Sequence, residues 1–439
     1  MTFSFRHWAA FPAFALSLTL HAGPGGVSTG CIGELSGQEC GPHLNTITTA
    51  VPFLMIGPDS RSGGMGDAGV ALPADANALH WNPSKLAFAE NESEVKLSVS
   101  PWLHTLVNDM TLTYLSAYKK LNKRSAVGGS LRYFNLGSIT FTDMGGNVIR
   151  DFKPTEFAVD VSFSQKFSER FAGGITLRYI NSNLTGGLNV AGANTKAGQA
   201  VASDISFFYQ NDEMQISKKK TTFAFGLDIS NIGNKMSYSE TSRTDFLPIN
   251  LRLGPALTVD LDKYNSITFN ADINKLLVPT PPVYKTEPDA DGNPVAVTDA
   301  DGNYVIFSGE DPNRGVAAGI IGSFSDAPGS VYTDADGVQH VESGSKLKEE
   351  LSEIYYGGGF EYWYAKQFAF RTGYFWEAAT KGNRKYFTMG FGVKYSMLSL
   401  DFSYLIANTT QSPLANTLRF TLGLNFDGKA KKKSSDATE

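Results

Sequence analysis

The stretch Phe387-Thr-Met-Gly-Phe-Gly-Val-Lys-Tyr395 decides the fold, because apolar residues alternate in it with small or polar ones. Two further runs, 398–406 and 418–426, repeat the alternation. A period of two residues indicates a β-strand with one apolar face and one polar face. The apolar faces are bulky and aromatic, and the opposite faces carry charge. This combination is typical of a transmembrane β-barrel, whose strands face lipid on one side and a polar lumen on the other.

The same alternation recurs along the preceding chain. Apolar residues alternate at 95–99, 112–114, 127–133, 157–163, 175–179, 201–209, 223–229, 249–259, 267–273, 356–362 and 368–376. With the three runs above, the count is about 14 strands, an even number as in single-chain bacterial barrels. We therefore predict an all-β fold, an antiparallel transmembrane barrel over residues 93–427.

Composition agrees with this class. The chain has 439 residues, and 12% of them are aromatic, as aromatic girdles at two membrane interfaces require. No run of 18 apolar residues follows the N-terminus, which disfavours transmembrane helices. The net charge of -5 argues against nucleic acid as a partner.

The N-terminus carries a predicted export signal over residues 1–22, with Arg6 and His7 before an apolar run that ends near Leu20. Two cysteines follow, Cys31 and Cys40, and an oxidising periplasm favours a small disulfide loop between them. Lipid attachment at Cys31 is the alternative, but a suitable apolar residue three positions before it is missing.

Residues 23–92 hold the most distinctive motif, Arg61-Ser-Gly-Gly-Met-Gly-Asp-Ala-Gly-Val70, followed by Asn77-Ala-Leu-His-Trp-Asn-Pro-Ser-Lys-Leu-Ala87. The glycines are not a phosphate loop, since no Gly-Lys-Ser/Thr follows, but they permit a tight coil in a confined space. We expect a small hatch folded into the periplasmic end of the barrel. The alternative without a special role is a glycine-rich surface loop followed by a surface helix. The motif positions are Arg61, Gly63, Gly64, Met65, Gly66, Asp67, Gly69, Asn77, Trp81, Asn82 and Pro83.

These two motifs resemble the PorV/PorQ family of Bacteroidetes outer-membrane proteins, and within it the PorV branch of the type IX secretion system. The resemblance runs from about Ile47 to Phe426. The step Asn82-Pro83-Ser84 is also similar to the Asn-Pro-Ala hatch signature of the wider FadL-like barrel superfamily. A PorQ-like identity stays open.

Loop lengths predict the orientation. Short connections alternate with longer ones, and short turns are periplasmic in such barrels. Only 210–220 is a longer connection on the periplasmic side. The longest connection, residues 275–350, is then an extracellular insertion, both chain termini are periplasmic, and residues 428–439 form a polar periplasmic tail.

The long insertion repeats Asp-Ala-Asp-Gly at Asp289, Asp299 and Asp334. Asp-Gly steps favour tight hairpin turns. Paired aspartates also suit a calcium ion, so Asp289, Asp291, Asp299 and Asp301 are weak metal candidates, although the full calcium-loop spacing is absent. Residues 343–352 predict a short amphipathic helix.

The polar strand faces carry both signs of charge, which favours internal ion pairs over an ion filter. The predicted lumen charges are Glu156, Asp160, Asp204, Asp228, Asp260, Asp272, Asp401, Arg132, Arg178, Arg252, Arg371, Lys394 and Arg419. No catalytic set stands out, and we expect neither an enzyme nor a cofactor. His80, next to Trp81, more often packs or caps than reacts. The set His104, Ser100 and Asp109 leaves a lipid A hydrolase open as a third alternative.

The resemblance implies a function. A PorV-like barrel binds secreted cargo that bears a C-terminal signal domain at the giant translocon barrel (SprA/Sov-like). It then shuttles this cargo to a PorU-like sortase and attachment complex, using extracellular loops, chiefly 275–350. Outer-membrane lipid and lipopolysaccharide surround it. The alternative is a FadL-like transporter of hydrophobic small molecules, which needs an apolar pocket and a lateral gap.

Overall fold

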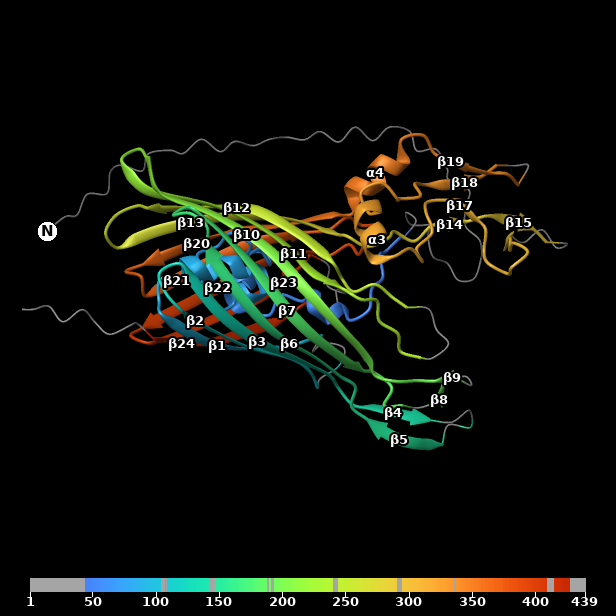
Figure 1. Ribbon diagram of the computed structural model, residues 1–439, viewed down its shortest axis with the longest axis horizontal. Helices are drawn as coiled ribbons and strands as arrows, with labels where there is room; N and C mark the ends of the chain where they lie inside the picture. The colour runs from blue at the N-terminus through green and yellow to red at the C-terminus, as the bar shows by residue number, and fades with distance from the viewer. Residues whose placement is uncertain are drawn as a thin grey trace, which may run out of the picture.

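A computed structural model of the chain describes residues 44–103, 107, 109–142, 145, 147–187, 189–190, 193–239, 244–289, 294–334, 337–408 and 414–426. The predicted signal, both cysteines and the polar tail lie outside these residues. The described chain forms one closed β-barrel, with a folded insertion and several hairpins at one end (Figure 1).

Fourteen antiparallel strands build the barrel, as predicted, and each pairs with the next along the chain. The strands are β1 (Ser93–Pro101), β2 (Met110–Lys120), β3 (Ser125–Leu136), β6 (Thr155–Lys166), β7 (Phe171–Asn183), β10 (Gly198–Ile216), β11 (Lys219–Gly233), β12 (Asn250–Asp260), β13 (Asn265–Leu276), β20 (Ile354–Tyr364), β21 (Phe368–Trp376), β22 (Lys385–Tyr395), β23 (Leu398–Ala407) and β24 (Leu418–Phe426). The first and last strands close the cylinder, with Ser93 opposite Phe426 and Val99 opposite Phe420. Closure leaves no unpaired strand edge facing lipid.

The apolar side chains of the strands point outward and the small or polar ones point into the lumen, as predicted. Phe387 and Phe391 are 54% and 52% exposed, whereas Thr388 between them is buried. The outward aromatic rings also pack across neighbouring strands, with ring centroids 5.3 Å apart for Phe402 and Phe420. Since these rings point away from the lumen, the apolar face is the lipid face. None of the helices in the described part of the chain is long and apolar enough to span a membrane.

The short connections gather at one end of the barrel, and one of them differs from the prediction. Residues 210–220 are not a longer loop, because β10 and β11 continue to a turn at Ser217 and Lys218, whose φ angles are 50° and 64°. Two consecutive positive φ angles match a tight hairpin turn. The hairpin therefore extends beyond its neighbours.

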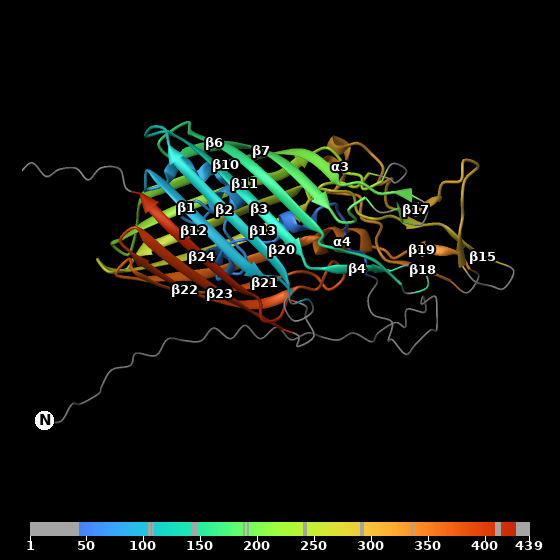
Figure 2. The same cartoon turned by 90° about the horizontal axis from the view of Figure 1, so that it is seen from below.

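The long connections gather at the opposite end (Figures 1 and 2). Hairpins β4 (Ile139–Thr142)–β5 (Val148–Phe152) and β8 (Asn189–Val190)–β9 (Ala193–Asn194) belong to the first half. The insertion between β13 and β20 contains β14 (Val283–Tyr284), β15 (Thr286–Pro288), β16 (Pro294–Ala296), β17 (Ile306–Ser308), α3 (Val316–Gly322), β18 (Val331–Thr333), β19 (Gln339–Val341) and α4 (Ser345–Ser352).

The three Asp-Ala-Asp-Gly repeats each fall between paired segments. The first follows β15 before its partner β16, the second lies between Thr298 and Tyr304, and the third separates β18 from β19. The hairpin interpretation is therefore confirmed, as is the short helix α4.

Residues 44–92, here called the inner segment, run through the barrel lumen. They contain the short helices η1 (Pro52–Met55), α1 (Ser60–Gly63), α2 (Ala78–Trp81) and η2 (Pro83–Phe88), drawn in blue within the barrel in Figure 1. The backbone N–H of Asn45 donates to Thr380 in a long connection, 3.0 Å away. The described chain thus starts at the long-loop end and runs to the short-turn end, where Lys120 donates to the Ala89 carbonyl and Lys166 lies over the Phe88 ring. Residues 1–43 lie outside the described part.

We expect an arginine on the lipid face to destabilise the barrel. The substitution Phe391→Arg should lower the free energy of unfolding by about 2 kcal/mol, because it places a charge in hydrocarbon. Urea unfolding from lipid vesicles, followed by tryptophan fluorescence, measures this loss.

The control is Val295→Arg on β16, an exposed loop position where the expected change is within about 0.5 kcal/mol. Equal stability of the Phe391→Arg protein and the wild type would contradict the lipid-facing assignment.

Candidate functional site

The motif glycines bring the inner segment against a buried tryptophan. The Trp81 indole Nε1 donates to Asp59, 2.6 Å away, and Asp59 also accepts the Ser62 backbone N–H at the start of α1. A Cβ on Gly69 would lie 2.6 Å from the Trp81 ring, so only glycine fits there. The motif therefore encodes a compact fold around one side chain.

The same segment packs directly on the barrel wall. Gly66 has a φ of +76°, and a Cβ there would lie 2.5 Å from the Tyr374 carbonyl oxygen of β21. A Cβ on Gly64 would meet the Cα of Gly390 in β22 at 3.1 Å. Glycines on both surfaces allow backbone to approach backbone in this region of the lumen.

A buried ion-pair network fixes the first motif. Arg61 and Arg371 both bind Glu361, at 2.8 and 2.7 Å, and Arg371 also binds Asp401 at 2.7 Å. Arg61 further contacts Asp75, which pairs with Lys96 at 2.9 Å. The network links the inner segment to β1, β20, β21 and β23, and every charge in it has an opposite partner, as burial demands.

Asp67 is a second anchor. Its backbone is in the left-handed region at φ 52°, and its carboxylate accepts bonds from Arg419 and from the Tyr386 hydroxyl, the latter at 2.6 Å. Both partners lie on the barrel wall. Charge pairing thus holds an otherwise unfavourable backbone conformation.

The second half of the motif is also attached to the wall. The backbone N–H groups of Gly69 and Val70 donate to Asp272 at 2.7 and 2.9 Å. Asn82 donates to the carbonyls of Val70 and Phe207, while Pro83 opens η2. The remaining motif residues are buried as well: Asn77 accepts from Ser116, and Met65 is fully enclosed.

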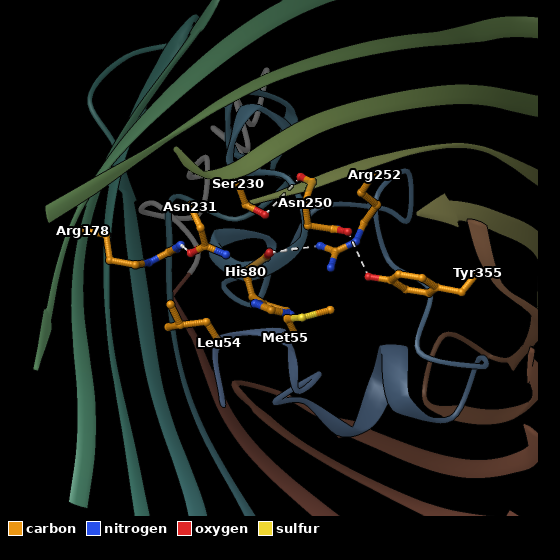
Figure 3. A pocket seen from close by; sticks show the side chains of 9 residues that line it. All are labelled: Leu54, Met55, His80, Arg178, Ser230, Asn231, Asn250, Arg252 and Tyr355. Atoms are coloured by element: carbon orange, nitrogen blue, oxygen red, sulfur yellow. Dashed lines mark hydrogen bonds between the residues drawn. The ribbon is translucent and has the colours of Figure 1, made fainter. Parts of the chain in front are cut away.

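A small polar pocket lies beside His80 (Figure 3). The Tyr355 hydroxyl donates to Asn250 at 2.9 Å, and Arg252 donates to the His80 carbonyl at 3.3 Å. The His80 ring lies between Arg132, 2.7 Å away, and the Trp81 ring. The space is about 10 Å³, close to the room of one water molecule, so this site packs rather than binds a substrate.

A larger cavity of about 390 Å³ lies nearer the long loops. Tyr355, Phe375 and Tyr386 form an aromatic wall, with Phe375 and Tyr386 stacked at 4.8 Å. Charged side chains also line it: Asp67, Arg252, Glu353, Glu377, Lys381, Arg384 and Arg419. Apolar side chains such as Met55, Trp102 and Leu405 lie between these charges, so the cavity is amphipathic.

Ion pairs also attach the long insertion to the barrel mouth. Glu353, just after α4, binds Lys275 at 2.5 Å and Lys381 at 3.1 Å. Glu349 binds Lys381 at 2.8 Å and the Asn45 side chain at 2.8 Å. Insertion, barrel wall and inner segment thus meet in one buried cluster.

The predicted lumen charges mostly come together. Arg178 pairs with Asp160 at 2.7 Å and Asp204 at 2.9 Å, and Glu156 accepts from Ser182. Lys394 is instead exposed, and Asp260 is only half-buried. Neither oxygen of buried Asp228 has a hydrogen-bond partner among the described residues.

Three lumen charges were missing from the prediction: Glu94, Lys96 and Glu361, all buried. Glu94 and Lys96 flank outward-facing Val95, and Glu361 lies between Phe360 and Tyr362. The alternation of these strands was the signal that places them in the lumen.

Among the described residues, the weak calcium positions belong to no cluster of metal-ligating side chains. The Asp299 carboxylate accepts the backbone N–H groups of Asp301 and Asn303 at 2.9 Å, so it holds a turn. Asp291 lies outside the described residues. No group of three or more metal-ligating side chains occurs among the residues that the structure describes.

The hydrolase alternative involves three residues near the first long connection. Ser100 donates to the Leu418 carbonyl, and Asp109 accepts the Ser138 N–H at 2.9 Å. His104 lies outside the described residues.

Breaking the buried network should destabilise the protein strongly. In Arg371→Met, Asp401 loses its ion-pair partner inside the lumen, and we expect a loss of about 3–5 kcal/mol in unfolding free energy. Urea unfolding measures it. Arg124→Met, which breaks the exposed pair with Glu169, is the control and should cost at most about 1 kcal/mol. Equal effects of the two substitutions would contradict the proposed anchoring.

Known structures with a similar barrel include a hydrocarbon channel, a toluene transporter and a FadL homologue. The CymD monoaromatic hydrocarbon channel is 12% identical over 85% of this chain and 98% of that chain, with a TM-score of 0.43. The toluene transporter TodX of P. putida is 12% identical over 85% and 99%, with a TM-score of 0.43. A FadL homologue of Pseudomonas aeruginosa is 12% identical over 88% and 99%, with a TM-score of 0.39.

The comparison with curated proteins finds no match. Among protein-family models, the one described as "Type IX secretion system protein PorV" matches residues 40–283, which is more than half of the 439 residues and includes the inner segment with both motifs. The chain is therefore an outer-membrane β-barrel that belongs to the PorV family of the type IX secretion system.

Proposed function

We propose that this protein is a closed, non-conducting binding partner for exported proteins in the outer membrane. It receives cargo with a C-terminal signal domain from a giant translocon barrel (SprA/Sov-like) and delivers it to a PorU-like sortase and attachment complex. The observation that carries the proposal is the division of the molecule into a lumen crossed by the inner segment and a large, firmly attached insertion at one mouth.

The segment inside the lumen argues against a protein-conducting pore. The inner segment crosses the barrel and is held by buried pairs such as Arg61–Glu361 and Asp67–Arg419. Removing one partner of a buried pair costs several kcal/mol, so displacement of the whole segment for each substrate is expensive. We propose that the segment acts as a permanent hatch and that cargo stays outside the barrel.

The insertion argues for a binding role. Its paired strands, α3 and α4 form structure of their own, and Glu349 and Glu353 fix it to Lys381 and Lys275. A surface that is already folded loses less conformational entropy when a partner binds. Residues 277–353 are therefore the proposed docking platform, facing the cell exterior.

Catalysis is not needed for this role. Most charges that converge in the described lumen are paired structurally, and His80 is enclosed between Arg132 and Trp81. We propose that the protein acts through binding alone and that covalent attachment of cargo belongs to its partners.

A second candidate function rests on the cavity of about 390 Å³, since FadL-like transporters hold hydrophobic molecules inside the barrel. Charged groups such as Arg252, Glu377 and Arg384 lie among its aromatic rings, and burying them against a hydrocarbon is unfavourable. The barrel is also closed along all fourteen strands. Both features favour the binding role over transport.

Affinity purification tests the two candidates. The full chain, tagged after Glu439 and extracted in mild detergent, should co-purify with a very large barrel protein and with exported cargo. Purification of the barrel alone with a bound fatty acid or other hydrophobic molecule would favour the transporter.

Excision of one part of the platform provides a sharper prediction. The Lys285 N–H donates to the Val305 carbonyl at 2.8 Å, so residues 286–304 leave and re-enter the insertion at adjacent points. Replacing them by a short Gly-Ser turn should leave the barrel and the α4 anchors intact. We expect normal membrane insertion but reduced display of cargo at the cell surface, measured by antibody labelling.

Shortening the β4–β5 hairpin is the matched control, because it removes another projecting hairpin from the same end. Display should stay near the wild-type level. If display is unchanged after the excision of 286–304 but is lost in the control, the proposal is contradicted. The docking surface would then belong to the loops in the first half of the barrel.

A further inference from the structure

Helices α3 and α4 present an unusual exposed surface beside the barrel mouth. Four large apolar side chains on and next to them face solvent: Ile321 is 75% exposed, Phe324 55%, Leu347 67% and Leu351 57%. Lys346 and Lys348 are exposed next to Leu347. We call these six residues the α3–α4 ledge.

One face of α4 is acidic and paired. Glu349 and Glu353 bind Lys381, and Glu350 binds Lys275 at 3.4 Å and accepts the Ala327 N–H. Neither Lys346 nor Lys348 has an acidic partner among the described residues. Leu347, Lys348 and Leu351 share the other face of α4, whereas Lys346 lies one turn before Glu349 and Glu350 on the acidic side and is exposed there.

Lys275 indicates where this unit lies. In β13, Phe269 and Ile273 face lipid, and Lys275 falls on the same side by alternation. It is nevertheless buried, because Glu350 and Glu353 bind it and the Phe324 ring lies 5.8 Å from its ammonium nitrogen. The α3–α4 unit thus covers the outer side of the wall at the end of β13.

Helix α3 supports the same placement. Its Val316 and Ile320 pack against a buried cluster of Phe246, Ile249, Leu277 and Val278, which also contacts Ile47 of the inner segment and, on the barrel wall, Ile229 and Leu251. These two residues lie opposite each other in β11 and β12, on the lipid-facing side of both strands. The apolar contact surface of α3 is therefore continuous with the lipid-facing belt of the barrel.

We infer that the α3–α4 ledge inserts into the interfacial region of the outer leaflet and binds anionic lipid head groups there. Exposed leucine, isoleucine and phenylalanine side chains enter the boundary of the acyl chains, while Lys346 and Lys348 pair with lipid phosphates. The ledge then tilts the insertion relative to the membrane and sets the height at which the docking platform is presented.

Photo-crosslinking in intact outer membranes tests this inference. A photoreactive amino acid at position 347 or 351 should form adducts with lipopolysaccharide, detected as a lipid-bearing gel shift that disappears after lipid A hydrolysis. The control position is Val338, equally exposed but at the turn of the β18–β19 hairpin, and it should give several-fold less lipid adduct. Adducts at 347 and 351 that contain only protein would overturn the inference and make the ledge a protein interface.

The charge component has its own test. The double variant Lys346→Glu, Lys348→Glu should reduce the lipid adduct at position 351 several-fold, while Lys123→Glu, Lys366→Glu at the short-turn end should not change it. Reconstitution in nanodiscs of phosphatidylcholine with or without lipid A separates the two contributions, since only lipid A offers the added phosphates. An adduct yield independent of lipid A and of both lysines would contradict the phosphate pairing.

Discussion

The constraint on which this structure depends is the satisfaction of backbone hydrogen bonds in lipid. Hydrocarbon offers no partner for an N–H or C=O group, so a sheet survives there only when it closes, and β1 meets β24 for that reason. A cylinder of fourteen strands is wider than its own wall side chains can fill. The inner segment occupies the space that closure creates.

Filling that space requires many polar contacts, because the inward face of a barrel is polar. Each charge taken into the lumen needs a partner, and the two motifs supply them: Arg61 for Glu361, Asp67 for Arg419, and backbone N–H groups for Asp272. Wall glycines such as Gly390 leave room for this backbone. Because the polar side chains of the lumen mainly bind the inner segment, we propose that the insertion at the barrel mouth recognises the cargo.

The sequence predicted the strands well because alternation is local and the bilayer enforces it. It failed where the bilayer does not act: β10 and β11 continue past the membrane through polar residues, so 210–220 resembled a loop. Partners such as Arg61 and Glu361, 300 positions apart, depend on barrel closure and no local pattern reveals them. Glu361 itself was recoverable, since it alternates with Phe360 and Tyr362. The entry of the inner segment from the long-loop end had no such signal.

Single-channel recording in planar lipid bilayers tests the central claim most directly. A barrel whose lumen is filled by residues 44–92 should insert without producing stable ion conductance across an applied voltage. The same protein with Arg61, Asp67 and Asp272 replaced by alanine should show conductance steps, because the inner segment loses its main anchors. A steady, porin-like conductance from the unaltered protein would contradict the account.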